Sequence, residues 1–192
     1  MARWEPDARG RLLCAALDLF AERGYDATTT AQIAERAGLT KTTLFRLFPD
    51  KREIVFQGQP TLIDLLTEAI EDAPAGVSAH ELMATGLRAL AGGHPQESRE
   101  TARTLDPIIA ASPELRERAV FKRSAITAAF EQALERRISD KRLAGVLADL
   151  AVRAYYAGYQ AWAEADDDRA LAEHALAELT SHQAATSLLA GQ

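Results

Sequence analysis

Residues 41–48 carry the side chains with the most specific chemistry in this sequence. Leu44 and Phe48 would face inward on a helix, because residues four apart share one helical face. The solvated face would then present Lys41, Thr42, Thr43, Phe45 and Arg46. Arg and Lys can donate to guanine O6 and N7 in the DNA major groove, and Thr methyls can contact the thymine methyl group. An ordinary solvated surface would have the same layout, so this helix alone leaves both interpretations open.

Local sequence signals predict two short helices and a turn around this face. Thr29 and Gln32 have the spacing of a capping box, which starts a helix. Gly38 breaks the helical pattern, and Thr40 can cap the next helix. Pro49 ends that second helix, since the residue before a proline avoids helical geometry. Two short helices around a glycine-containing turn predict a helix-turn-helix.

A longer pattern surrounds these two helices. It combines a Gly-aromatic step, a pair of threonines, an Ile-Ala…Ala-Gly spine and an ungapped third helix, carried here by Gly24, Tyr25, Thr28, Thr29, Ile33, Ala34, Ala37, Gly38 and Lys41–Thr43. In this pattern the chain resembles the DNA-binding domain of TetR-family transcriptional regulators over about residues 9–56. The resemblance implies a helix-turn-helix domain at residues 1–50 and a helical effector-binding and dimerisation domain at residues 51–192.

The resemblance also implies which side chains touch DNA. Family members usually contact bases and phosphates from the positions of residues 41–43, and Lys51 matches a lysine that grips a phosphate. The predicted DNA contacts are Thr29, Thr30, Thr40, Lys41, Thr42, Thr43, Phe45, Arg46 and Lys51. Phe45 and Leu47 depart from the family pattern, which often has Tyr and His there. Loss of the Tyr hydroxyl predicts altered affinity, with the ring packing on a sugar or a thymine methyl.

Composition predicts an all-α fold for the whole chain. Ala and Leu contribute 39 and 24 residues, against 13 for Val and Ile together, and strands favour the β-branched residues. A helix over residues 50–70, with a kink or a brief interruption at Pro60, would connect the two domains. About nine helices are expected, the others over residues 8–23, 29–37, 41–48, 78–91, 96–111, 113–138, 140–165 and 168–189.

Small and apolar residues on the last two predicted helices suggest a contact between two copies of the chain. The resemblance implies that these helices form a dimeric four-helix bundle. The candidate interface residues are Ala154, Gly158, Ala161, Leu171, Ala175 and Leu179. The alternative is that the same faces complete the core of a monomer.

The resemblance also implies a cavity for a small molecule within the C-terminal helices. Its candidate lining is Leu105, Ile109, Phe121, Phe130, Tyr155 and Tyr159, although aromatic residues at helical spacing are more often core residues. We expect a ligand-responsive transcriptional regulator, a repressor that binds a palindromic operator as a homodimer and is released by an apolar small-molecule effector. A helical sensor or interaction protein that does not bind DNA is the alternative.

The sequence contains none of the common motifs of enzymes or metal-binding proteins that we considered. GxGxxG, GK[ST], HExxH and CxxC are absent, and no His follows Glu at the spacing of a di-iron site. We therefore expect no catalysis, metal or cofactor. The net charge of -6 is uneven, because residues 1–56 hold nine Lys and Arg against eight Asp and Glu. A lone cysteine and the absence of long apolar runs predict a cytoplasmic protein without membrane contact.

Overall fold

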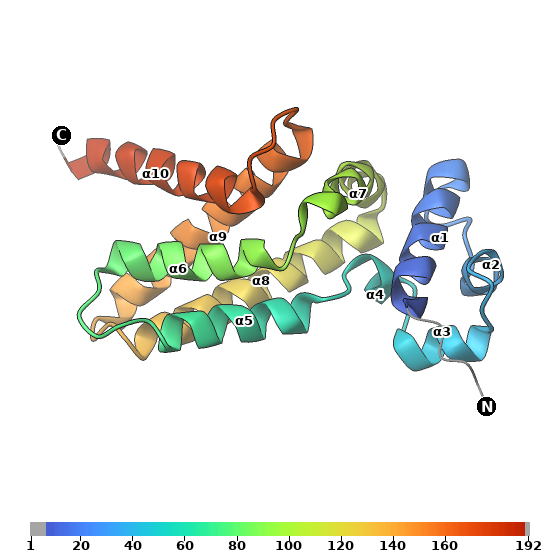
Figure 1. Ribbon diagram of the computed structural model, residues 1–192, viewed down its shortest axis with the longest axis horizontal. Coiled ribbons are helices and arrows are strands. Elements are labelled where there is room, and N and C mark those ends of the chain that lie inside the picture. The colour runs from blue at the N-terminus through green and yellow to red at the C-terminus, as the bar shows by residue number, and fades with distance from the viewer. Residues whose placement is uncertain (1–6, 191–192) are drawn as a thin grey trace. The chain divides into compact units, whose positions relative to one another are not determined.

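The computed structural model describes residues 7–190, and every regular element in them is a helix. This confirms the all-α prediction (Figure 1). None of the described helices is both long and apolar enough to cross a bilayer. The elements are α1 (Ala8–Arg23), α2 (Thr30–Arg36), α3 (Lys41–Leu47), α4 (Arg52–Val55), α5 (Gln59–Glu71), α6 (Ala79–Gly92), the 3-10 turn η1 (Gln96–Ser98), α7 (Arg99–Ala111), α8 (Pro113–Glu135), α9 (Lys141–Glu164) and α10 (Leu171–Ala190).

The predicted connecting helix over residues 50–70 is in fact two helices, α4 and α5. Gly58 separates them with a φ of 87°, a left-handed conformation that glycine adopts without the steric cost of a Cβ. Pro60, expected at a kink or a brief interruption, lies in the first turn of α5, where its missing N–H has no helical partner to lose. The helical pattern is therefore interrupted at Gly58, and the described residues contain ten α-helices, in line with the expectation of about nine.

The first compact unit contains the residues up to Gln57 and Thr104–Val120. Its core is built by α1, α2 and α3, with Leu12, Phe20 and Ile33 among the buried side chains. Ile108 of α7 and Leu115 of α8 are buried in the same cluster. Residues 104–120 therefore contribute to this core.

Ion pairs also hold α8 to α4 within the first unit. Arg118 pairs with Glu53 at 2.5 Å, and Arg52 lies 3.4 Å from Glu114. Both pairs join residues more than sixty positions apart in the chain, and no local sequence signal predicts them.

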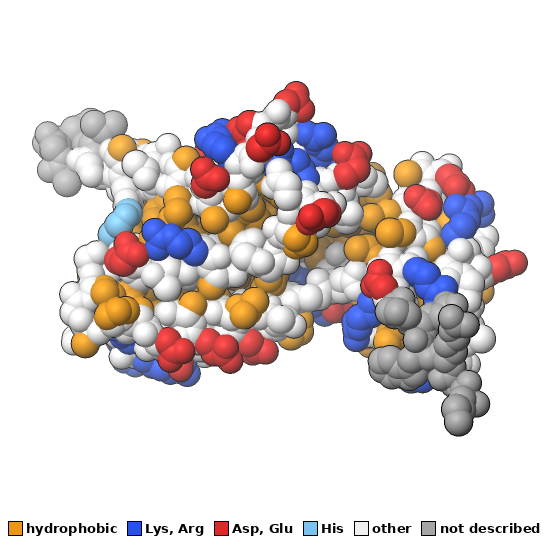
Figure 2. Space-filling model, viewed as in Figure 1, with side chains coloured by type: hydrophobic (Ala, Val, Ile, Leu, Met, Phe, Trp, Pro, Cys, Tyr) orange, Lys and Arg blue, Asp and Glu red, His pale blue; other side chains and the backbone are white. Residues whose placement is uncertain are grey.

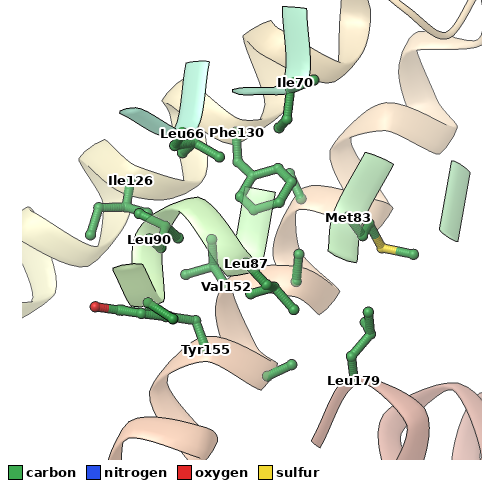
Figure 3. Packing of buried hydrophobic residues seen from close by; sticks show 14 of the residues in the cluster. Leu66, Ile70, Met83, Leu87, Leu90, Ile126, Phe130, Val152, Tyr155 and Leu179 are labelled. Atoms are coloured by element: carbon green, nitrogen blue, oxygen red, sulfur yellow. The ribbon is translucent and has the colours of Figure 1, made fainter. Parts of the chain in front are cut away.

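The second compact unit contains Gly58–Arg103 and Phe121–Gln192. Helices α5, α6, α8 and α9 surround a packed apolar core, to which α10 adds Leu179 (Figure 3). Figure 2 shows a row of acidic side chains along α5, where Asp64, Glu68 and Glu71 are exposed. Much of the negative charge of the chain belongs to this unit, in line with the uneven charge of the sequence.

Candidate nucleic-acid interface

The start of α2 has the hydrogen bonds that its sequence predicts. The Gln32 N–H donates to Thr29 Oγ1 at 3.3 Å, and the Thr29 N–H donates to Gln32 Oε1 at 2.9 Å. The Thr29–Gln32 bonds satisfy N–H groups at the helix start that would otherwise lack partners. Buried Thr28 fixes the preceding loop, because its hydroxyl proton is shared between the carbonyls of Gly24 at 2.8 Å and Leu19 at 3.2 Å. Thr29 is exposed and Thr30 half-buried at this end of the helix.

Helix α3 is capped by Thr40 and anchored by two inward side chains. Thr40 Oγ1 accepts the Thr43 N–H at 3.1 Å and lies 3.0 Å from Thr43 Oγ1. Leu44 and Phe48 are buried, as the sequence predicts. The Thr43 hydroxyl is therefore engaged at the cap. The inner side of the helix is thus packed against the core, as a recognition helix requires.

Two pairs of residues, each four apart, form the exposed face of α3. Lys41 and Phe45 are one pair, with Lys41 Nζ 5.6 Å from the centre of the Phe45 ring. Thr42 and Arg46 are the other, and all four side chains are exposed. We call these four residues the α3 face. It offers two cations, a hydroxyl and an aromatic ring, which can donate to phosphates and base edges and make apolar contacts in a major groove.

Lys51 has a structural role that the sequence alone does not reveal. Its Nζ donates to the carbonyl of Tyr25 at 2.8 Å and to that of Thr28 at 3.0 Å. The same Nζ lies 3.8 Å from the centre of the Tyr25 ring. Burial lowers the pKa of Lys51, an effect that the Glu114 charge partly opposes. Lys51 therefore holds the loop between α1 and α2 in place. A lysine ammonium has three N–H groups, so one remains for another acceptor.

A bidentate ion pair joins α1 to α2 on the surface. Arg36 Nη1 and Nη2 donate to the two Glu22 carboxylate oxygens at 2.9 and 3.0 Å. The pair lowers the pKa of Glu22, chiefly through the hydrogen bond from Arg36. Both groups are exposed, so the pair fixes geometry more than it stabilises the fold.

Known proteins share this N-terminal region. Residues 12–57 match the model of the bacterial regulatory proteins, tetR family. The chain is 34% identical to the HTH-type transcriptional regulator TcmR of Streptomyces glaucescens over 84 residues, which cover 44% of the chain and 37% of TcmR. It is 47% identical to the uncharacterized HTH-type transcriptional regulator YvkB of Bacillus subtilis over 45 residues, 23% of the chain and 24% of YvkB. These alignments span about a third or less of each relative's length.

The likeness to a solved structure extends over both units of the chain. Thermus thermophilus FadR, a TetR-family transcriptional repressor solved in complex with lauroyl-CoA, is 25% identical to this chain. The match covers 91% of the chain and 93% of FadR, with a TM-score of 0.52. The segment of residues 12–57 thus matches the tetR family of bacterial regulatory proteins, and the chain as a whole is similar in fold to a member of that family. The resemblance predicted from the sequence is thereby confirmed.

The predicted effector-pocket residues have different environments. Leu105 and Ile109 pack against the core of the first unit. Phe130 and Tyr155 are buried in the core of the second unit, and Tyr159 packs against it. The Phe121 side chain is 61% exposed. Phe130 and Tyr155 thus have the core role that aromatic residues at helical spacing more often have.

Five of the six predicted dimer-interface residues are buried within the single chain: Ala154, Gly158, Leu171, Ala175 and Leu179. Only Ala161 is partly exposed. At Gly158 an added Cβ would lie 2.5 Å from Ala175 Cα, so α9 and α10 pack backbone to backbone there. The small-residue pattern marks close packing inside one chain, which is the alternative to a contact between two copies, and a part of these five residues in a dimer stays a prediction.

The outer sides of α9 and α10 instead form an open groove of ≈ 550 Å³. Val146 on its edge is 65% exposed, and Leu143, one turn earlier on α9, is 43% exposed. The groove is lined by Val146, Leu147, Leu150 and Arg153 of α9 and by Gln183 and Thr186 of α10. We call this surface the α9–α10 groove. Sequence reasoning missed it, although Val146 and Leu150 are four residues apart on one helical face.

A half-buried histidine in the second unit, His94, was also missed. His94 Nε2 lies 2.8 Å from the Tyr155 hydroxyl, and the Tyr159 ring meets the imidazole edge-on at 5.4 Å. Burial lowers the pKa of His94. The two groups come from the segment after α6 and from α9, sixty-one residues apart, so spacing could not pair them.

The lowered pKa of His94 predicts that stability falls in mild acid. The unfolded chain takes up this proton below about pH 6.5, whereas the folded chain takes it up only at lower pH. The unfolded state therefore binds more protons between the two pKa values, and the free energy of unfolding decreases as the pH falls through that window. We expect thermal unfolding between about pH 7.5 and 5.5 to depend less on pH in His94→Asn than in the wild type.

His80 provides the matched control, because it is exposed at the start of α6 and bonded to Gln183 at 3.0 Å. His80→Asn should keep the wild-type pH dependence. Equal slopes for His94→Asn and the wild type would refute the assignment to His94.

Proposed function

We propose that this protein is a DNA-binding transcriptional regulator that reads duplex DNA with the α3 face. The observation that carries the proposal is the capped, core-anchored α3, with Lys41, Thr42, Phe45 and Arg46 turned to solvent. Arg46 can donate two parallel bonds to guanine, and Lys41 and Thr42 can donate to bases or phosphates. Thr29 and Thr30 at the start of α2, Thr40 and Thr43 at the cap of α3, and Lys51 are proposed to orient the head on the DNA backbone.

We further propose a repressor that binds a palindromic operator as a homodimer and leaves it when a small-molecule effector binds. The match of residues 12–57 to the tetR family and the likeness to a repressor solved with lauroyl-CoA support this. We propose that it acts in the cytoplasm, on DNA, and without catalysis. A hundredfold loss of operator affinity requires about 2.7 kcal/mol of coupling, within the ordinary range for allosteric proteins.

Helices α7 and α8 offer a route for that coupling, because each contributes residues to both units. In the second unit Arg103 Nη2 donates to the carbonyl of Ala165 at 2.7 Å, at the end of α9. In the first unit Ile108 of the same α7 is buried with the α1 core. Helix α7 therefore has contacts in both units.

Selection from a random duplex library tests DNA binding. The protein should enrich one sequence, hereafter the selected duplex, with two related half-sites. Deleting the gene should raise transcription from promoters that contain this sequence. Absence of any enriched sequence would refute DNA reading and favour a sensor or interaction protein, and a fall in transcription would make the protein an activator.

Effector release is tested by titrating lauroyl-CoA into the complex with the selected duplex. Dissociation of the complex would support an acyl-CoA effector. By linkage, DNA must then weaken lauroyl-CoA binding by the same factor. Equal lauroyl-CoA affinities for the free and the DNA-bound protein would refute release by this compound.

We propose that a second copy of the chain covers the α9–α10 groove. Its apolar edge and the charged pair Asp149 and Arg153 suit a two-fold interface. Val146→Glu would place a charge in that interface, so the dimer dissociation constant should rise at least about tenfold, or about 1.4 kcal/mol. Sedimentation at micromolar concentration measures it.

Leu65→Glu is the matched control, because Leu65 is 40% exposed on α5, outside the α9–α10 groove. It should leave the dimer intact. A Val146→Glu protein that dimerises like the wild type would place the interface elsewhere.

A further inference from the structure

Phe45 is the aromatic member of the α3 face. Its side chain is 45% exposed, while the other aromatic side chain of residues 41–48, Phe48, is buried. A large apolar side chain that is half exposed on α3 gains little from burial in the free protein. Its apolar surface is available to a bound partner.

The neighbours of Phe45 define where its ring would lie on DNA. Lys41 is one turn earlier, with its ammonium 5.6 Å from the ring centre, and Arg46 is the next residue. Thr42 lies three residues before Phe45, on the adjoining stripe of the helix. The ring therefore lies beside groups that can reach base edges.

The chemistry of the ring limits what it can recognise. Phenylalanine has no hydroxyl to donate to a phosphate, and its ring cannot pair with the donors and acceptors of guanine, cytosine or adenine. The major groove displays one apolar group on its base edges, the 5-methyl group of thymine. A ring at this position is complementary to that methyl group.

We propose that Phe45 is a specificity-determining residue that selects thymine at one position of each half-site through its 5-methyl group. The inference rests on the proposed function, since it requires α3 to enter the major groove. On this proposal the preference for thymine comes from contact between the Phe45 ring and the methyl group. It does not depend on hydrogen bonds from Lys41 or Arg46.

Replacing thymine by uracil tests the inference, because this change removes the methyl group and keeps every base-edge hydrogen bond. In the selected duplex each thymine is replaced in turn, and affinity is measured by fluorescence anisotropy. Loss of one buried methyl group should weaken binding by about fourfold at one half-site and about sixteenfold when both are changed. The other thymines should tolerate the change.

Two variants assign the effect to the ring. In Phe45→Ala the uracil penalty should disappear, because no apolar group meets the methyl. In Phe45→Leu it should persist, because an apolar side chain remains. Leu65→Ala, which removes a comparably exposed apolar side chain on α5, should keep the full penalty.

The outcomes separate this inference from the function on which it rests. A selected duplex with no uracil-sensitive thymine, or an equal penalty in Phe45→Ala and the wild type, would overturn the role of Phe45 while leaving DNA reading intact. Failure to enrich any duplex would overturn DNA reading itself. Unchanged circular dichroism of the variants shows that they are folded.

Discussion

Lys51→Ala should unfold at a markedly lower temperature than the wild type and bind the selected duplex more weakly. The substitution removes both hydrogen bonds from Nζ, and the carbonyls of Tyr25 and Thr28 lose that donor. Hydrogen bonds to a charged group contribute about 1.5–3 kcal/mol each, but Lys51 is partly exposed, so we expect a total loss of about 2–4 kcal/mol. Chemical denaturation measures it.

DNA binding should weaken for two reasons in this variant. The loop between α1 and α2, which leads to Thr29, loses its two hydrogen bonds from Lys51. The positive charge of Lys51, which is proposed to lie near the DNA phosphates, is also removed. The slope of log affinity against log salt should fall by about one unit.

Lys141→Ala is the control, since Lys141 is exposed and pairs with Glu135 at 3.5 Å on the surface. It should leave both stability and DNA affinity within error of the wild type. A Lys51→Ala protein as stable as the wild type would contradict the structural role of Lys51.

Gly158→Ala should destabilise the second unit although it adds only a methyl group. The new Cβ would lie 2.5 Å from Ala175 Cα and 2.6 Å from its N, which are backbone atoms of α10. The backbone of α10 can make room for the methyl group only if one of the two helices shifts. Overpacking of this kind costs about 1–3 kcal/mol. We expect a value near the upper end, about 3 kcal/mol, because the contact is with backbone.

Gly92→Ala is the matched substitution, at the last residue of α6, where an added Cβ meets nothing within 4 Å. Alanine should be neutral or stabilising there by up to about 1 kcal/mol, because it loses less backbone entropy than glycine. Similar effects of the two substitutions would mean that α9 and α10 are not packed this closely.

The first three helices could be predicted because their signals are local. The capping box of Thr29 and Gln32 and the cap at Thr40 involve residues three apart, and both form as expected. Leu44 and Phe48 follow from helical periodicity. Short segments of the sequence therefore contain the signals that predict these helices.

The remaining features depend on contacts between distant residues. The bonds from Lys51 to the loop span 23 and 26 positions, and Leu115 joins a core built mainly by residues before 57. Small residues such as Gly158 indicate close helix packing, but they do not say whether the other helix belongs to the same chain. Gly58 and Pro60 are two residues apart, and only backbone geometry shows which of them interrupts the helical pattern.

A titration with two duplexes tests DNA reading by the α3 face most directly. Fluorescence anisotropy at about 0.15 M salt compares the selected duplex with a shuffled one of the same composition. The wild type should prefer the selected duplex by at least about a thousandfold. A combined Lys41→Ala, Thr42→Ala and Arg46→Ala variant, folded as judged by its unfolding temperature, should lose most of that preference. Equal affinity of the wild type for both duplexes, or an undiminished preference in the variant, would contradict DNA reading by α3.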